Sequence, residues 1–203
     1  GNDPAKEAES LTRLIDAGAD GLVVNTCGGN DEAIAAAAGR LPVVLLDRDV
    51  ADGGIDLVTS NNRELVAGLV DALAAAGSER LCLLTEASDD SPVRRERAEA
   101  FTDELSRRGL AGEVVTLADG GATGVGRLDE TIRGYAGKRL GLIAVNGLVF
   151  LRLTEALAQL GPSLPAGLKI STFDDYPWNH VLFGGVTTAA QDTLTIAERV
   201  VER

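Results

Sequence analysis

The stretch LKISTFDDYPWNHVLFGGVTTAAQ, residues 168–191, decides the fold of this chain. Its first six residues are mostly apolar or β-branched and follow a loop rich in proline and glycine, so they predict a short buried strand. Asp174 and Asp175 follow directly and therefore lie at the carboxyl end of that strand. In an open α/β sheet this is the edge at which ligands bind. The two aspartates are therefore candidate binding residues.

Three rigid rings follow the aspartates: Tyr176, Pro177 and Trp178. Rings beside carboxylate acceptors suit a polyhydroxylated small molecule, because its apolar face stacks on a ring while its hydroxyls donate hydrogen bonds. The same residues also fit a purely structural interpretation, an acidic turn that caps a short helix with Pro177 at its first position. Local features favour the two interpretations equally.

Composition excludes several classes of function. The chain has 203 residues, 45% of them hydrophobic, which suffices for a sizeable core in one or two globular units. The formal net charge of −12 argues against direct binding of nucleic acid, because phosphate binding needs clustered lysine and arginine. No apolar run approaches the roughly 18–20 residues that cross a membrane, and the N-terminus does not look like a signal peptide. We therefore expect no membrane partner and a cytoplasmic location.

Metal and cofactor chemistry have little support in the sequence. Cys27 and Cys82 lie in or beside predicted strands without CxxC spacing, so we expect reduced thiols, and His180 is the only histidine. The run GGATGVG at residues 120–126 could cradle a pyrophosphate between a strand and a helix. However, no acidic residue ends the next strand, which stops at Asn146 and Gly147. We therefore expect no metal and no cofactor.

Strands alternate with helices along the whole chain. Short apolar runs predict strands at residues 21–25, 42–46, 55–59, 81–85, 114–117, 140–145, 168–173 and 186–190. Helical spacing and capping signals predict helices at residues 4–18, 31–38, 63–76, 92–108, 128–135 and 149–160, and a last one from residue 192. Asp3 is the expected N-cap of the first helix, and Asn61 and Asn62 the expected caps of the third. This alternation predicts an α/β fold with parallel, doubly wound sheets.

Several stretches, in the right order, resemble bacterial transcription regulators of the lactose-repressor (LacI) family. FDDYPW at residues 173–178 and VTTAAQD at residues 186–192 are similar to the end of the family's effector domain. IDAGADGLVV, a helix and LPVVLLDRDV are similar to its first lobe, and RRERAEAF to the start of a helix that contacts the ligand. Together these stretches span nearly the whole chain.

The resemblance implies two doubly wound parallel-sheet lobes of the periplasmic-binding-protein type, with a small effector bound in the cleft between them. Residues 1–59 plus 190–203 would form the N-terminal lobe and residues 60–189 the C-terminal lobe, hinged near Thr59 and Ala189. The expected ligand contacts are at strand ends or helix starts: Asp47, Arg97, Asn146 and Asp174, with Trp178 as the stacking ring. The effector would be a sugar or sugar derivative.

Two residues make this assignment less direct. Arg97 also reads as an ordinary solvated arginine, because it follows Arg94 and Arg95 in a run of charges. In the family's "ND" element an aspartate follows the asparagine, whereas in this chain Gly147 follows Asn146. The polar pattern of the pocket, and with it the ligand, therefore differs from the usual one.

The resemblance also implies further parts and partners. In the family a helix-turn-helix segment and a first strand, helix and strand precede the position of Asn2, so we expect the N-terminal lobe to be incomplete and the chain truncated at both ends. Operator DNA would then be bound only through that absent N-terminal domain. The family pairs through its effector domains, and helices 63–76 and 149–160 look more apolar than one sheet face needs. We therefore expect a two-fold homodimer that uses one of these helices.

The leading hypothesis is the effector-sensing and dimerisation domain of a LacI-type regulator. The alternative is a sugar-binding protein of a transport system, which shares the two-lobe fold; the apparent absence of a signal peptide and the DDYPW and VTT segments favour the regulator. A third hypothesis is a nucleotide-dependent α/β enzyme that uses residues 120–126. Such an enzyme needs a general acid or base, and no constellation based on His, Cys or Ser supplies one. We expect no catalysed reaction.

Overall fold

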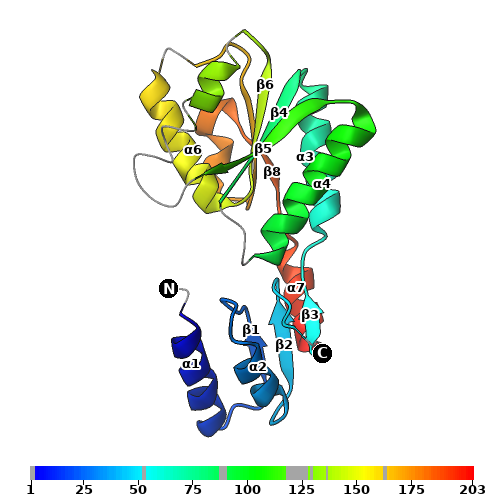
Figure 1. Ribbon diagram of the computed structural model, residues 1–203, viewed down its shortest axis with the longest axis vertical. Coiled ribbons are helices and arrows are strands. Elements are labelled where there is room, and N and C mark those ends of the chain that lie inside the picture. Colours follow the sequence, from blue (N-terminus) through cyan, green and yellow to red (C-terminus); the bar gives the residue numbers. More distant parts are fainter. Residues whose placement is uncertain are drawn as a thin grey trace. The chain divides into compact units, whose positions relative to one another are not determined.

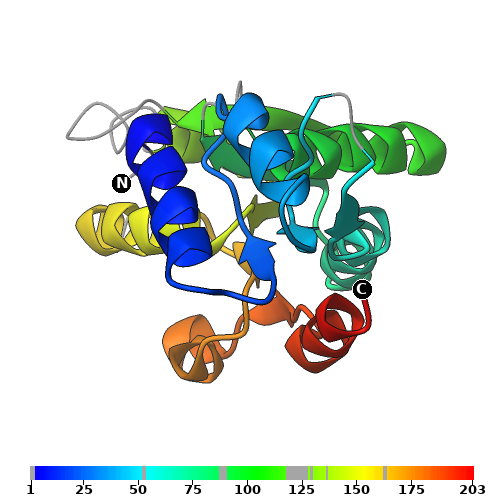
Figure 2. The ribbon, with the colours of Figure 1, turned by 90° about the horizontal axis from the view of Figure 1, so that it is seen from below.

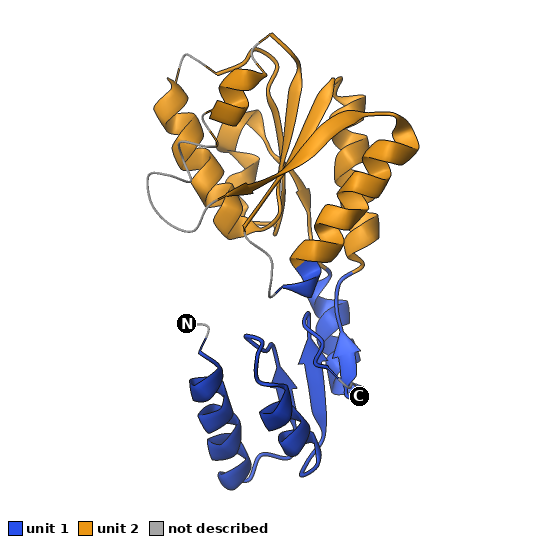
Figure 3. Cartoon of the chain, in the orientation of Figure 1, with its two compact units in different colours: residues 1–60, 90–93, 192–203 blue, residues 61–89, 94–191 orange. Residues whose placement is uncertain are grey.

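The chain forms two compact units in a computed structural model (Figure 3). Unit 1 comprises residues 1–60, 90–93 and 192–203, and unit 2 comprises residues 61–89 and 94–191. The structure describes residues 3–51, 54–86, 91–117, 128, 130–135, 137–161 and 164–203. The glycine run at residues 120–126 lies outside these residues, so the structure does not bear on the nucleotide hypothesis there.

Unit 1 is built on a parallel sheet of three strands in the order β1-β2-β3 (Figure 1). The strands are β1 (Leu22–Val24), β2 (Val43–Leu46) and β3 (Asp56–Val58), and the helices are α1 (Pro4–Asp16), α2 (Asp31–Ala38) and α7 (Thr193–Val201). Asp3 caps α1 as predicted, because its side chain accepts hydrogen bonds from the backbone N–H groups of Ala5 and Lys6. Helices α1 and α2 lie side by side in both views (Figure 2).

A carboxylate from α1 holds the loop that follows β1. Glu7 accepts hydrogen bonds from the Thr26 hydroxyl at 2.8 Å, the Cys27 backbone N–H at 3.0 Å and the Asn30 amide at 3.2 Å. Burial alone would raise the pKa of Glu7, but these hydrogen bonds outweigh it and lower the pKa. The Glu7 carboxylate is therefore a structural anchor of unit 1.

Unit 2 is a parallel sheet of five strands in the order β5-β4-β6-β7-β8. The strands are β4 (Arg80–Glu86), β5 (Ala111–Leu117), β6 (Leu140–Ala144), β7 (Lys169–Phe173) and β8 (Thr187–Ala189). Helices α3 (Asn62–Ala75) and α4 (Pro92–Arg108) cover one face, and α6 (Gly147–Leu160) covers the other (Figure 1). Both faces are buried, which explains the nearly continuous apolar runs of β4 and β6.

Successive side chains of the strands alternate between the two faces of the sheet and divide the core of unit 2 into two layers. Leu81 and Leu83 of β4 pack with the apolar side chains of α3 and α4, whereas Cys82 and Leu84 pack with those of α6. Successive strand residues point to opposite faces, so one short run serves both layers. Burial raises the pKa of the Cys82 thiol to about 12, which leaves it protonated and unreactive.

The α/β fold with parallel sheets that the sequence predicts is confirmed. Several element boundaries differ from the predicted ones, among them the start of β5 and the end of β4. Strand β5 begins at Ala111 and not at residue 114, because Gly112 lets it pass close to β4: a Cβ there would lie 2.4 Å from the Leu81 carbonyl oxygen. Strand β4 continues through Glu86, which the sequence had placed in a polar loop.

Candidate ligand-binding site

Three neighbouring strands of unit 2 end in polar residues at one edge of the sheet. Glu86 ends β4, Asn146 follows β6 and Asp174 follows β7, and these strands are adjacent in the order β4-β6-β7. Because the strands are parallel, their carboxyl ends meet at the same edge. The structure therefore brings together two predicted ligand contacts, Asn146 and Asp174, with a carboxylate that the sequence analysis did not select.

Arg97 reaches this edge from α4. Its side chain is buried, with 4% of the residue exposed, and its guanidinium carbon lies 3.9 Å from the centre of the Phe173 ring. The Nε–H donates to Oδ1 of Asn62 at 2.8 Å, and Nη1 donates to the Val145 carbonyl oxygen at 2.7 Å. The interpretation of Arg97 as an ordinary solvated arginine is therefore wrong, because packing and hydrogen bonds fix its position.

Asn62 holds Arg97 in place. It is completely buried, and its amide donates to Oε2 of Glu96 at 2.8 Å while its oxygen accepts from Arg97. The predicted cap of α3 is supplied by Asn61, whose side-chain oxygen accepts from the backbone N–H of Glu64. The second predicted cap, Asn62, instead bridges α3 and α4.

Asn146 is the N-cap of α6. Its Oδ1 accepts from the backbone N–H of Val149 at 2.8 Å, and its Nδ2 donates to Oε2 of Glu86 at 3.4 Å. The cap starts α6 at Gly147, two residues earlier than the sequence predicts. Both ends of the Asn146 amide therefore have a fixed partner.

Asp174 ties the end of β7 to two other segments. Its backbone has φ 67°, in the left-handed region that non-glycine residues seldom adopt. One carboxylate oxygen accepts from the backbone N–H of Gly147 at 3.0 Å and the other from Nε2 of Gln191 at 2.9 Å. Neither aspartate caps the short 3₁₀ helix at Pro177–His180, whose N-cap is Tyr176. The prediction that Pro177 begins a short helix is thus confirmed, whereas the prediction that the acidic turn caps this helix is wrong.

Asp47 lies in unit 1, at the carboxyl end of β2. Its backbone is also left-handed, with φ 62°, and its carboxylate accepts from the Thr59 hydroxyl at 3.4 Å. The side chain is half-buried. Asp47 and Asp174 thus share a local geometry, a strand-end aspartate turned out of the strand direction, in two different units.

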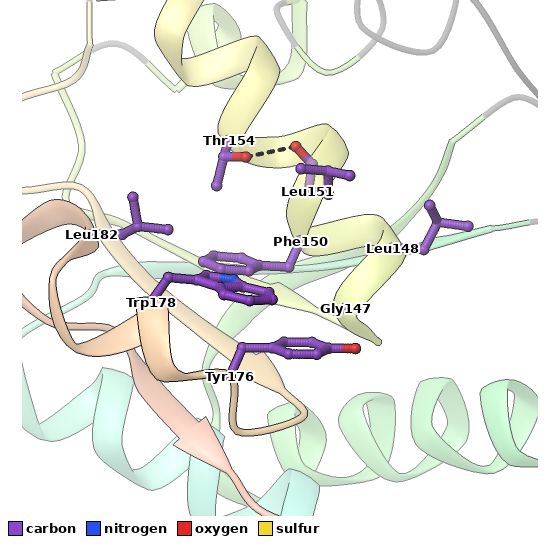
Figure 4. A pocket seen from close by; sticks show the side chains of 8 residues that line it. All are labelled: Gly147, Leu148, Phe150, Leu151, Thr154, Tyr176, Trp178 and Leu182. Atoms are coloured by element: carbon purple, nitrogen blue, oxygen red, sulfur yellow. Dashed lines mark hydrogen bonds between the residues drawn. The ribbon is translucent and has the colours of Figure 1, made fainter.

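Trp178 lines a mostly apolar pocket beside α6 (Figure 4). Its ring stacks on Tyr176 with centroids 4.6 Å apart and planes 6° apart. Both rings line a pocket of ≈ 580 Å³ beside α6, whose lining residues are mostly apolar: Gly147, Leu148, Phe150, Leu151, Thr154, Tyr176, Trp178 and Leu182. Arg97, Asn146 and Asp174 are not among these residues, so the structure does not place Trp178 with them.

Sequence reasoning missed Glu86 and Arg152, and it predicted Asn62 only as a helix cap and not as the partner of Arg97. Glu86 is 7% exposed, and its carboxylate lies 3.2 Å from Nη2 of Arg94 and 3.4 Å from Nη1 of Arg152. Its place directly after a buried apolar run was the available signal, because a charged residue there stands at the ligand-binding edge of the sheet. Within the residues that the structure describes, no three His, Cys, Asp or Glu side chains are grouped to hold a metal ion, and no helix is long and apolar enough to cross a membrane.

Family models identify the fold family. The model for periplasmic binding proteins and the sugar binding domain of the LacI family matches residues 1–122, and a model for a periplasmic binding protein-like domain matches residues 70–203. This chain belongs to the family of periplasmic binding proteins and LacI-type sugar binding domains. The resemblance seen in the sequence motifs is therefore confirmed.

Curated relatives of this LacI-type domain are transcription regulators. The chain is 28% identical to the HTH-type transcriptional regulator KdgR of Bacillus subtilis over 100% of its own length and 61% of the relative's. It is 33% identical to the HTH-type transcriptional regulator PtxS of Pseudomonas plecoglossicida over 98% of its own length and 58% of the relative's. The chain thus spans about 60% of the length of these two relatives.

Solved structures share the fold. A periplasmic binding protein/LacI transcriptional regulator from Alkaliphilus metalliredigens, complexed with D-xylulofuranose, matches with a TM-score of 0.80 at 19% identity, over 99% of this chain and 74% of its own. The Cra transcriptional dual regulator of Pseudomonas putida, in complex with fructose 1-phosphate, matches with a TM-score of 0.80 at 18% identity, over 99% and 75%. At this identity the likeness shows the fold.

Gly147, where the resemblance to the LacI family implies an aspartate, lies against the Tyr176 ring. A Cβ on residue 147 would lie 2.5 Å from Cε2 and 2.8 Å from the hydroxyl oxygen of Tyr176. The Tyr176 ring thus occupies the space that a side chain at residue 147 would need.

Proposed function

We propose that this chain is the effector-sensing and dimerisation domain of a LacI-type transcriptional regulator that binds a sugar or sugar derivative. The observation that carries the proposal is the polar edge of unit 2, where Arg97, Asn146 and Asp174 converge on adjacent strand ends. Membership of the family and two relatives that regulate transcription support it. Residues 1–59 plus 190–203 and residues 60–189 would be the two lobes, hinged near Thr59 and Ala189.

Each proposed contact has a defined chemical role. Asp47 and Asp174 accept hydrogen bonds from ligand hydroxyls, and Asn146 donates or accepts. Arg97 donates to a ligand oxygen, and its position is fixed in advance by Asn62, Val145 and Phe173. Because Arg97 is held in place before the ligand binds, less side-chain entropy is lost on binding, and the complex is more stable. Trp178 stays a predicted stacking contact, although its apolar surroundings also suit an assembly surface.

A ligand panel tests the proposal. Thermal unfolding is measured with D-xylulose, D-fructose 1-phosphate, D-glucose and D-gluconate, and separately with NADH. We expect at least one sugar to raise the unfolding temperature; at 100 times its Kd a ligand stabilises by about 2.7 kcal/mol. NADH is expected to leave it unchanged, because no cofactor and no reaction belong to the proposal. Stabilisation by NADH alone would favour the nucleotide-dependent enzyme.

We further propose a two-fold homodimer through α6. Most apolar residues of α3 are buried in the core: Val66, Leu69, Val70 and Leu73 are at most 3% exposed. In contrast, α6 exposes Leu148 and Leu151, at 52% and 55%, beside Trp178 at 52%. An exposed apolar cluster of this kind marks an interaction surface, and a two-fold contact needs only one such patch.

Sedimentation velocity at micromolar concentration tests the dimer. Leu151→Glu should yield a monomer, because it puts a charge into the apolar contact. Leu14→Glu is the matched control: Leu14 on α1 is 51% exposed and lies in unit 1, so the mutant should stay dimeric. A wild-type monomer with and without the panel sugars would favour the transport-protein alternative.

The remaining parts of the proposal concern the whole regulator. The relatives are described as HTH-type regulators. The net charge of −12 makes direct binding of DNA by this chain unfavourable. Operator DNA would therefore be bound by a separate N-terminal segment, and effector binding here would change that affinity. Such a regulator would act in the cytoplasm, where the operator is.

A further inference from the structure

We propose that Glu86 is a positioning residue of the effector site, which fixes the amide of Asn146 and joins it to α4 and α6. This inference rests on the proposed function for its binding consequence, but its structural part concerns this chain alone. Glu86 belongs to no motif of the sequence analysis. Its role follows from its partners.

Glu86 is buried, and both oxygens of its carboxylate lie close to polar partners. Glu86 is 7% exposed at the end of β4, and a buried carboxylate is tolerated only where charges and hydrogen bonds compensate it. Oε2 lies 3.2 Å from Nη2 of Arg94 and accepts from Nδ2 of Asn146 at 3.4 Å. Oε1 lies 3.4 Å from Nη1 of Arg152. One carboxylate thus joins the ends of β4, α4, β6 and α6.

The contacts of the Asn146 amide fix its orientation. Its oxygen accepts from Val149 N–H at 2.8 Å, which requires the nitrogen to point the other way, and there it meets Glu86. A carboxylate has no hydrogen to donate, so it accepts from the amide nitrogen and rejects the flipped amide. Glu86 and the Val149 N–H therefore select the same orientation of the Asn146 amide.

Glu86 also balances charge. It lies close to two arginines, Arg94 and Arg152, that come from helices on opposite faces of the sheet. Loss of the carboxylate charge would weaken both ion pairs as well as release the Asn146 amide.

A ligand-free experiment tests the structural part. In ¹⁵N-labelled protein, the Asn146 side-chain amide signal is assigned by its absence in Asn146→Ala. Glu86→Gln should shift that signal and speed hydrogen exchange of the Val149 amide roughly three- to tenfold, because the cap of α6 is weakened. Glu79→Gln is the control: Glu79 pairs with Arg139 at 3.1 Å just before the start of β4 and should change neither. An unshifted Asn146 signal in Glu86→Gln would overturn the proposal.

A double-mutant cycle tests the binding part, with the tightest of the four panel sugars as probe. Glu86→Gln should weaken binding about five- to tenfold in the wild-type background and less than about twofold in the Asn146→Ala background, because the two residues act as one unit. Equal weakening in both backgrounds would show that Glu86 acts only through general stability and would overturn the positioning role. If no panel sugar binds the wild type, the proposed function fails, and the nuclear magnetic resonance experiment still decides the role of Glu86.

Discussion

Replacement of Arg97 gives the sharpest test of how unit 2 is held together. Arg97→Ala removes the donors to Asn62 Oδ1 and the Val145 carbonyl oxygen, two acceptors in a buried region. Each hydrogen bond to a charged group contributes about 1.5–3 kcal/mol, and the guanidinium over Phe173 adds about 1–2 kcal/mol in a desolvated site. Since such contributions overlap, we expect a loss of at least about 3 kcal/mol.

The measurement is the free energy of unfolding from urea titration, followed by circular dichroism. Arg97→Lys should lose about 1–3 kcal/mol, because a single ammonium cannot reach both acceptors and stack on the ring. Arg95→Ala is the control: Arg95 is exposed on the same helix, and surface changes usually stay within about 0.5 kcal/mol. If Arg97→Ala is as stable as Arg95→Ala, Arg97 does not hold the α4 layer to the sheet, and the argument from its contacts fails.

Two further predictions concern other parts of the chain. Gly147→Asp should displace Tyr176 and break its stack on Trp178, which costs about 0.5–1.5 kcal/mol of stability. The fluorescence emission of the single tryptophan should shift as a result. Gly134→Ala is the control: no heavy atom lies within 4 Å of its new Cβ, so it should leave the stack and the emission unchanged. In unit 1 the pKa of Glu7 is lowered by folding, so its charged form stabilises the native state at pH values above its ordinary 4.5, and this contribution is lost as the pH falls through the lowered value. The stability difference between wild type and Glu7→Gln should therefore shrink on acidification. A difference that is constant with pH would contradict the assigned anchor role.

The fold was largely predictable because local signals agree with it. Apolar runs that end in Asp47, Asn146 and Asp174 mark both the strands and their ligand-facing edge. Asp3 with Pro4, and Asn61, mark helix starts by hydrogen bonds within a few residues. Such signals need no information about distant parts of the chain.

The site was less predictable because its contacts join distant segments. Glu86 looked like a loop residue, since its partners Arg94 and Arg152 come from two helices that the sequence does not connect to it. The burial of Arg97, which the sequence predicted as a ligand contact, was not predictable, because it depends on Phe173 of β7 and on Val145, directly after β6. The stack of Trp178 on Tyr176 and the pocket that both rings line beside α6 also depend on segments distant in the sequence.

The central claim is that a sugar-like effector is recognised by the polar strand ends, and titration calorimetry of Asp174→Asn against wild type tests it most directly. With the tightest sugar of the panel, the substitution should weaken binding about tenfold, because one charged acceptor is lost. Asp175→Asn is the control: Asp175 is the exposed neighbour and should keep wild-type affinity. Equal affinity of all three proteins, or no heat with any panel sugar, would contradict the account.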